Sequence, residues 1–335
     1  MRETVSRTSS TMTGRAIPWP RRLRYLAEAA GFFVVIGFFR LFSVERASAV
    51  GAWIGRVGVA PTGLSKLARE NLRAAYPDKT AEQIEALIRA MWDNLGRVMA
   101  EYAHLDKIRW KTAKPRIEVS GVEHIAEAQA RGRGVLLVSA HFANWEVMPI
   151  IGHELGLPGA AVVRPANNPY VNRWLDRLRL RNGMPEIIAK GAAGTRRIFT
   201  LLRKGECICI MVDQRVSEGI PAPFFGRDAL TTPAPAALAL KLGAAVLPIT
   251  NVRTGGAHFH FRAHPPIEPP NTGDPERDLV TYTAAINAFM ETQVREHPEQ
   301  WLWIHRRWVD PDAALRKRAQ ALSRGGATNA TSNRV

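Results

Sequence analysis

The chain has 335 residues, of which 46% are hydrophobic, so it can form one large α/β domain with extensions or two ordinary domains, and wholesale disorder is excluded. Its 46 Lys and Arg residues outnumber 30 Asp and Glu, and the net charge of +16 calls for a polyanionic neighbour such as nucleic acid, an anionic membrane or a phosphorylated substrate. Nucleic acid is the least favoured of these, because the basic residues are scattered arginines without a zinc-finger or RNP-type motif.

The N-terminal part of the chain divides into two segments. Residues 1–20 are polar and rich in Ser, Thr and Arg, which is typical of a disordered tail. Residues 21–45 contain an uncharged stretch from Ala29 to Phe39, which is shorter than the roughly 20 apolar residues of a comfortable bilayer crossing. No small-residue cleavage site directly follows this stretch, so a signal peptide is not favoured. We therefore predict a membrane-anchor helix over 21–45 that lies at the membrane interface, with a single span as the alternative.

Residues 80–105 predict an amphipathic helix. Thr80 and Gln83 have the spacing of a capping box. Apolar residues then recur at helical spacing from Ile84 to Tyr102. A stripe of this kind is more often packing than function, so we assign it to the core.

From about residue 115, short apolar runs alternate with helical segments. The expected strands are 135–140, 160–164, 207–213, 245–252 and 258–264. The expected helices between them lie near 168–181, 192–204 and 233–242. This alternation predicts an α/β fold with a mainly parallel central sheet flanked by helices.

Polar residues stand where three of these strands end. His141, Arg164 and Asp213 lie at such ends, where reactive groups gather in parallel sheets. Glu146 follows in the first turn of the next helix, from which its carboxylate is expected to fold back and hydrogen-bond to the His141 imidazole. The other ring nitrogen would then be a general base for a hydroxyl. The sequence has no G-x-S-x-G motif and no cysteine placed as a nucleophile, which argues against a covalent acyl-enzyme.

Simpler interpretations of these residues compete with the catalytic one. His141 would then cap the sheet, and Glu146 would favour a helix N-terminus. Arg164 and Asp213 would form one structural ion pair. The three histidines within 258–264 raise the alternative of a surface metal site, but solvated or paired strand histidines are favoured, and we expect no metal.

Four sequence blocks occur in a specific order along the chain. They are GVEHIAEAQARGRGVLLVSAHFANWE, VVRPANNPYVNRW, LLRKGECICIMVDQRVSEGIPAPFFGRDALTT and PEQWLWIHRRW. Together they resemble the lipid A biosynthesis (late) acyltransferases of the lysophospholipid acyltransferase-like superfamily, over about residues 20–310. Ala143 stands where many relatives carry glycine. The resemblance implies an acyltransferase domain over 46–310 with its site at H-x-x-x-x-E, and the remaining residues 311–335 are expected to be a flexible tail.

The resemblance implies transfer of a fatty acyl chain from acyl carrier protein to a hydroxyl of a phosphorylated, acylated glucosamine disaccharide, a lipid A precursor. This step of lipopolysaccharide biosynthesis is expected at the cytoplasmic face of the bacterial inner membrane, with no cofactor other than the acyl carrier protein donor. His141 would deprotonate the hydroxyl and Glu146 would orient His141. Arg164 would grip a phosphate or the thioester oxygen, and Asp213 would position that arginine or bind a sugar hydroxyl. Further substrate contacts are expected at Asn144, Gln214, Phe224, Phe225, Thr231, His305, Arg306 and Arg307.

Two motifs leave alternatives open. The loop predicted at 223–226 (PFFG) with Thr231 and Thr232 either lines an acyl channel or is a hydrophobic plug. In WLWIHRRW (301–308), the tryptophans either sit with the arginines at an anionic membrane surface or are buried with the arginines exposed. The competing functions are acylation of another glycolipid such as a phosphatidylinositol mannoside, a histidine-dependent esterase or thioesterase, and a non-enzymatic basic binding protein.

Overall fold

The computed structural model describes residues 18–308. The predicted flexible tail over 311–335 lies outside the described residues, as do residues 1–17 of the predicted N-terminal tail. All five strands and all four helices predicted from residue 80 onward are confirmed, with ends that differ by a few residues.

Between residues 18 and 308, the main sheet has seven strands in the order β1-β9-β8-β2-β5-β3-β4. Its strands are β1 (Ile117–Ser120), β2 (Val135–Ser139), β3 (Gly159–Val163), β4 (Ile187–Ala189), β5 (Cys207–Met211), β8 (Ala245–Gly255) and β9 (His258–Ala263). Strands β8, β2, β5, β3 and β4 are parallel, whereas β9 runs antiparallel to β8 and β1 pairs with β9. The predicted mainly parallel sheet flanked by helices is therefore confirmed.

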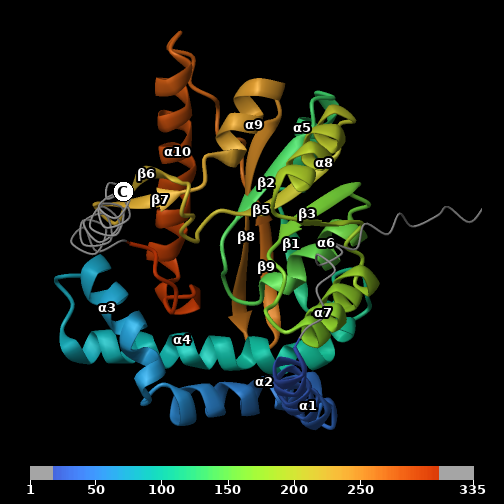
Figure 1. Ribbon diagram of the computed structural model, residues 1–335, viewed down its shortest axis with the longest axis vertical. Coiled ribbons are helices and arrows are strands. Elements are labelled where there is room, and N and C mark those ends of the chain that lie inside the picture. The colour runs from blue at the N-terminus through green and yellow to red at the C-terminus, as the bar shows by residue number, and fades with distance from the viewer. Residues whose placement is uncertain (1–17, 309–335) are drawn as a thin grey trace, which may run out of the picture.

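Helices cover both faces of this sheet (Figure 1). One face packs against α8 (Ala192–Arg203), α9 (Ala234–Leu242) and α10 (Pro275–Glu296). The other face packs against α5 (Val122–Ala130), α6 (Met148–Glu154) and α7 (Pro169–Arg181). Each strand of the centre contributes alternate residues to the two cores, as the period of two in a strand requires. The central strands are therefore buried on both sides, which explains their continuous apolar runs.

The N-terminal helices form a layer at one end of the sheet. They are α1 (Trp19–Arg40), α2 (Val44–Trp53), α3 (Lys66–Ala75) and α4 (Ala81–Glu101). Figure 1 shows α4 running across the end of the sheet, with α2 on the far side of α4. The predicted capping box is confirmed, since the Thr80 and Gln83 side chains each bond to the other's backbone N–H. Short helical turns complete this layer and the loops: the π-helical η1 (Ile54–Val59) and the 3₁₀ turns η2 (Gly63–Ser65), η3 (Tyr102–Lys107), η4 (Trp145–Val147) and η5 (Pro298–Gln300).

Three glycines bring α2 and η1 unusually close to α4. A Cβ on Gly51 would lie 2.3 Å from the Gly96 carbonyl oxygen, and a Cβ on Gly55 would lie 1.9 Å from the Trp92 carbonyl oxygen. A Cβ on Gly96 would in turn lie 2.1 Å from the Gly51 carbonyl oxygen. The absence of side chains at these three positions is therefore what lets the helices approach. The outward side of α2 and η1 is left with exposed apolar residues, including Trp53 and Val57.

The loop prediction at 223–226 is wrong, because these residues belong to a two-stranded hairpin of β6 (Ile220–Phe224) and β7 (Arg227–Thr231). Its two-residue turn is Phe225–Gly226, with positive φ at both residues (52° and 69°), as tight hairpin turns favour. The Phe225 N–H donates to Glu291 Oε2 at 2.6 Å, which anchors the turn to α10.

Candidate active site

The register between β2 and β5 sets two side chains side by side. Ser139 aligns with Met211 at the carboxyl ends of the strands, and His141 and Asp213 follow two residues later on each strand. His141 Nδ1 lies 2.8 Å from Asp213 Oδ1, and the His141 backbone N–H donates to Asp213 Oδ2 at 2.9 Å. Asp213 is buried and His141 is 19% exposed, so the imidazole is the part of the pair that reaches open space.

Trp301 supplies a third hydrogen bond to the carboxylate. Its indole Nε1–H donates to Asp213 Oδ2 at 2.8 Å, and its side chain is 1% exposed. The same segment holds the loop after His141, because Phe142 forms a β-bridge with Trp301 and the Ala143 N–H donates to the Gln300 carbonyl at 3.1 Å. The loop turns sharply at Ala143, whose φ of 43° is unusual for a residue other than glycine.

Burial and charge have opposing effects on the pKa values of His141 and Asp213. Burial alone would raise the pKa of Asp213, but the charge and hydrogen bonds of His141, together with the Trp301 indole, lower it to about 2. Burial alone would lower the pKa of His141, but Asp213 outweighs it, and the net pKa is raised above 6.5. An ionised Asp213 can only accept, so Nδ1 of the neutral imidazole carries the hydrogen. Nε2 is then the nitrogen that can accept a proton from a substrate.

The predicted hydrogen bond from Glu146 to His141 is wrong, since Asp213 occupies that place. Glu146 is 4% exposed and bonds instead to the Arg179 guanidinium, with Nη2 at 2.5 Å from Oε1 and Nε at 3.0 Å from Oε2. The Tyr102 hydroxyl donates to Oε1 at 3.0 Å. Burial and the Glu146 charge raise the pKa of Tyr102, so it stays a neutral donor. Glu146 still acts on His141 through its charge, which raises the pKa of the imidazole.

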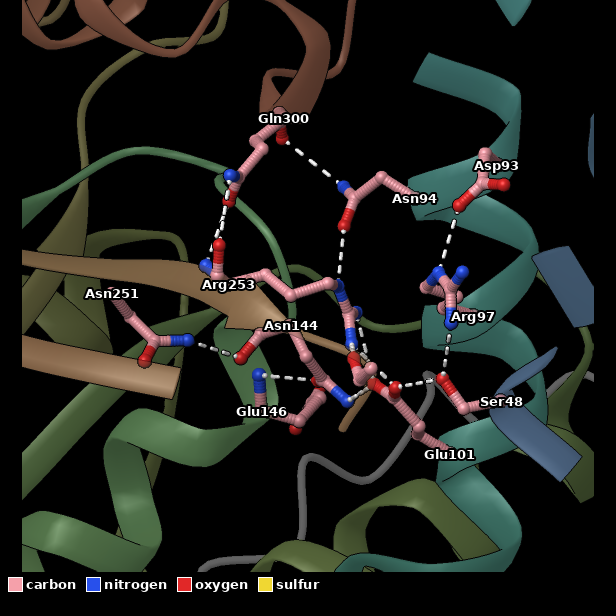
Figure 2. A network of polar contacts seen from close by, with 11 residues as sticks. Ser48, Asp93, Asn94, Arg97, Glu101, Asn144, Glu146, Asn251, Arg253 and Gln300 are labelled. Atoms are coloured by element: carbon pink, nitrogen blue, oxygen red, sulfur yellow. Dashed lines mark hydrogen bonds and ion pairs between the residues drawn. The ribbon is translucent and has the colours of Figure 1, made fainter. Parts of the chain in front are cut away.

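Asn144, a predicted substrate contact, is buried and links the side chains around it (Figure 2). Its Oδ1 accepts the Glu146 N–H at 3.2 Å, and its Nδ2 donates to Glu101 Oε2 at 2.9 Å. Glu101, at the end of α4, is paired with Arg253 of β8 through contacts of 2.5 and 3.0 Å. Asn251 Nδ2 donates to the Asn144 carbonyl at 2.8 Å. The network thus ties the loop that carries the site to both α4 and β8, and it engages both polar atoms of the Asn144 side chain.

A pocket of 710 Å³ opens beside the dyad, within the size range of small-molecule sites. Four of the predicted residues line it: His141, Glu146, Arg164 and Gln214. Its walls are mostly apolar and come from both sheet faces, for example Met148 and Met211 from one face and Ile198 and Leu238 from the other. Arg164 is exposed and is not paired with Asp213, so the alternative of a structural ion pair is wrong.

Cys209 also lines the pocket, but its thiol is not a nucleophile there. Burial raises its pKa to about 12, so the thiol is neutral near pH 7. Among the described pocket residues, His141 is therefore the group suited to activate an attacking hydroxyl.

The hairpin residues lie away from the pocket. Phe224 and Phe225 are buried against Trp301, Trp303 and Trp308, so these two aromatic residues form a hydrophobic plug. Thr232 of the same motif, directly after β7, does line the pocket. Thr231 is also buried, and its predicted substrate contact is replaced by a hydrogen bond to Arg307.

In WLWIHRRW the alternative of buried tryptophans is confirmed and Arg306 is exposed, but Arg307 is not exposed as that alternative predicts. The tryptophans are buried, but so is Arg307, whose guanidinium donates to Asn287 Oδ1 at 2.7 Å, Thr231 Oγ1 at 2.9 Å and the Leu230 carbonyl at 3.1 Å. It also stacks 4.9 Å from the Phe224 ring. Burial lowers the pKa of Arg307 to about 10, although the Asp213 charge opposes this. Arg307 therefore joins the hairpin to α10 and does not meet a lipid headgroup.

The remaining predicted residues do not line the pocket. His305 is half-buried and burial lowers its pKa, and Arg306 is exposed. Of the histidines within 258–264, His260 on β9 bonds to Ser120, and His264, just after β9, bonds to Thr250. Within residues 18–308, no three His, Cys, Asp or Glu side chains are grouped so as to hold a metal ion.

Three residues of the site were missed from the sequence. Lys190 lines the pocket directly after β4. The short apolar run IIA before it could have predicted a strand, with Lys190 at its carboxyl end. Trp301 belongs to a motif that had been noted, but its partner is 88 residues away. Arg179 is one of several arginines on α7, and nothing local distinguishes it.

A histidine hydrogen-bonded to a buried carboxylate lies beside a mostly apolar pocket at the carboxyl ends of a parallel sheet, an arrangement that suits general-base chemistry on a substrate with an apolar part. The family model of the bacterial lipid A biosynthesis acyltransferases matches residues 20–310, so the chain belongs to this family and is an acyltransferase.

The chain is also similar to individual known proteins. The chain is 32% identical to the lipid A biosynthesis palmitoleoyltransferase of Escherichia coli (strain K12), over 72% of this chain and 78% of that protein. It is 25% identical to the phosphatidylinositol mannoside acyltransferase of Mycobacterium tuberculosis (strain ATCC 25618 / H37Rv), over 94% of this chain and 95% of that protein. The crystal structure of the 1-acyl-sn-glycerophosphate acyltransferase from Thermotoga maritima aligns with a TM-score of 0.35 and 15% identity, over 77% of this chain and 99% of that one.

Proposed function

We propose that the protein transfers a fatty acyl chain from an acyl carrier protein thioester to a hydroxyl of a lipid A precursor. The observation that carries this proposal is the His141–Asp213 pair at the rim of an apolar pocket, in a chain that belongs to the lipid A acyltransferase family. The pocket is suited to an acyl chain, and Nε2 of His141 is the nitrogen available to a hydroxyl.

The chemistry follows from the site. His141 Nε2 takes the proton of the acceptor hydroxyl while the oxygen attacks the thioester carbonyl carbon. The imidazolium that forms is stabilised by Asp213, and the Glu146 charge adds to this. The tetrahedral intermediate then collapses, the C–S bond breaks, and the imidazolium returns its proton to the departing sulfur. The products are the ester and the free thiol, and no covalent acyl-enzyme is needed.

We further propose that the protein works at the cytoplasmic face of the bacterial inner membrane. No helix between residues 18 and 308 has the length and apolarity needed to cross a bilayer. Helix α1 nevertheless exposes large apolar side chains, among them Trp19, Leu23 and Val34, next to the exposed Arg21 and Arg22. A helix with exposed apolar and cationic residues suits an anionic membrane surface. The net charge of +16 also favours an acidic carrier protein as partner.

The test is an acyl-transfer assay with the purified full chain, acyl carrier protein thioester and a lipid A precursor in mixed micelles. We expect thioester consumption that requires the acceptor and an acylated product by mass spectrometry, both lost in His141→Ala. Equal consumption without acceptor would show a thioesterase instead. A phosphatidylinositol mannoside is the second acceptor to compare, because the mycobacterial relative aligns with nearly the whole chain. A clear preference for it would overturn the assignment to lipid A.

A further inference from the structure

Two cationic side chains leave neighbouring strand ends beside the dyad. In the parallel ladder of β3 and β4, Val163 aligns with Ala189. Arg164 and Lys190 are the next residues on the two strands. They therefore lie opposite each other, on neighbouring strands about 4.8 Å apart. Both are exposed, and both line the pocket that His141 also lines. Like charges at adjacent positions of neighbouring strands repel each other, so this pair is unfavourable unless an anion lies between them.

No carboxylate of residues 18–308 neutralises the pair. Neither Arg164 nor Lys190 forms an ion pair within this part of the chain. The acidic side chain among the described pocket residues is Glu146, and both of its oxygens already bond to Arg179. The positive charge at this side of the pocket is therefore unbalanced.

The cationic pair lies next to the reacting group. Strands β2, β5, β3 and β4 are consecutive neighbours in the sheet, and their ends carry His141, Asp213, Arg164 and Lys190 in that order. The Lys190 charge reaches the dyad, since it opposes the rise in the pKa of His141. An anion bound by Lys190 would remove this opposition and so make His141 a stronger base.

We propose that Arg164 and Lys190 together bind a phosphate group of a substrate and hold it next to the hydroxyl that His141 deprotonates. The identity of that substrate rests on the proposed function, whereas the anion site itself does not. A guanidinium presents two parallel donors to a phosphate, and the Lys190 ammonium adds a compact charge from the neighbouring strand. The first turn of α8, which follows Lys190, lines the same pocket, and a helix N-terminus also favours negative charge.

Two substrates of an acyl carrier protein-dependent transfer contain such a group. The acceptor carries phosphate on its sugars, and the donor carries a phosphodiester in the arm that bears the thioester. The shared chemistry is a phosphate ester, and the source is distinguished by experiment.

The first experiment measures binding without turnover. The full chain is titrated calorimetrically with N-acetylglucosamine 1-phosphate, and with N-acetylglucosamine as the uncharged control. We expect Lys190→Gln to weaken binding of the phosphorylated sugar about tenfold, the size of one lost charged hydrogen bond, and Lys190→Arg to retain it within about threefold. The matched control is Lys204→Gln, which removes the same charge from the exposed opposite end of α8 and should change binding less than about twofold.

The second experiment locates the phosphate during transfer. If it belongs to the acceptor, Lys190→Gln raises the acceptor KM about tenfold with a smaller change in kcat, and the effect disappears with a dephosphorylated acceptor. If it belongs to the donor, the donor KM rises instead, and the effect disappears with an acyl N-acetylcysteamine thioester, which has no phosphate. Either result supports the site and names its ligand.

Two results would overturn the proposal. One is phosphorylated-sugar binding that is unchanged in Lys190→Gln, and the other is an equal loss in Lys204→Gln. Because the titration requires no reaction, it gives its answer even if no acceptor is acylated. Failure of the proposed function and failure of the anion site are thereby distinguished.

Discussion

Replacing Asp213 with asparagine tests which carboxylate serves His141. The amide has almost the same shape, so its oxygen can still accept from the His141 N–H or the Trp301 indole. Its NH₂ group, however, cannot accept the Nδ1 hydrogen that the carboxylate accepts. The imidazole then favours the tautomer with hydrogen on Nε2, and this nitrogen can no longer take a proton from the substrate.

The size of the loss can be worked from the dyad. The drop in the Asp213 pKa from 3.8 to about 2 corresponds to about 2–3 kcal/mol for the charged pair, since one pKa unit is about 1.4 kcal/mol. Losing this stabilisation of the imidazolium slows transfer about 100-fold. The wrong tautomer slows it further, so we expect kcat to fall by about 10³–10⁴ in total.

The pH dependence gives a second readout of the same variant. Activity requires neutral His141, so in the parent protein it falls as the pH drops through the raised pKa of His141, which lies above 6.5. Without the carboxylate, burial dominates and the pKa of His141 falls below 6.5. The acidic limb of the residual activity should therefore move to lower pH.

Stability should follow the same pair. The raised pKa of His141 contributes stability that is present below pH 6.5 and is lost as the pH rises through the folded-state pKa. The lowered pKa of Asp213 contributes stability that is present above pH 3.8 and is lost as the pH falls toward 2. The difference in unfolding free energy between the parent protein and Asp213→Asn should thus be largest between pH 4 and 6.5, by urea denaturation.

The matched variant is Glu146→Gln, because Glu146 is the carboxylate nearer to His141 in sequence. We expect it to reduce kcat far less than Asp213→Asn, about tenfold, since Glu146 acts on His141 only through its charge. Circular dichroism would establish that both variants are folded. Full activity in Asp213→Asn together with an inactive, folded Glu146→Gln would refute the reasoning and restore the dyad predicted from sequence.

Three further outcomes follow from the buried contacts. Trp301→Phe removes a hydrogen bond to the charged dyad and should lower kcat about tenfold and stability by about 1.5–3 kcal/mol at pH 7, so a variant with unchanged kcat and pH profile would contradict its positioning role. Glu101→Gln breaks the buried pair with Arg253 and should cost about 3–5 kcal/mol in urea denaturation, and a loss below 1 kcal/mol would be incompatible with that contact. Gly55→Ala places a methyl group against α4 and should lower the free energy of unfolding by at least about 1–3 kcal/mol. The control is Gly58→Ala, where the nearest atom is 4.0 Å away and no loss of stability is expected. Similar melting temperatures for the two variants would argue against close helix packing.

The main sheet was predictable because its central strands are buried on both faces and so have continuous apolar runs. Helix α10 was not predicted, since charged and polar residues are interspersed along Pro275–Glu296. The hairpin strand β6 was not predicted either, because it contains Pro221 and Pro223. Proline is not expected in the interior strands of a sheet. It forms here because it pairs with one strand only, so each proline nitrogen can face away from the ladder.

The sequence was sufficient to predict which polar residues stand at strand ends, but not which residues they bond to. His141 and Asp213 were both expected at carboxyl ends, but which strands are neighbours depends on tertiary pairing. Sequence proximity therefore favoured Glu146, five residues away, over Asp213, 72 residues away. The burial of Arg307 was hidden for the same reason, because its partners lie 20 to 77 residues from it.

The alignment of the dyad across β2 and β5 bears on how this enzyme can change during evolution. Backbone hydrogen bonds between two central strands fix the spacing of His141 and Asp213, so their meeting does not depend on the length of any surface loop. Arg164 and Lys190, by contrast, stand on the outermost strands of that edge, and loops and α8 begin beside them. On the proposed function, insertions and substitutions there would alter the choice of acceptor without disturbing the alignment of His141 and Asp213. The sheet thereby places the residues of the proposed reaction on its central strands and those of the proposed phosphate site at its edge.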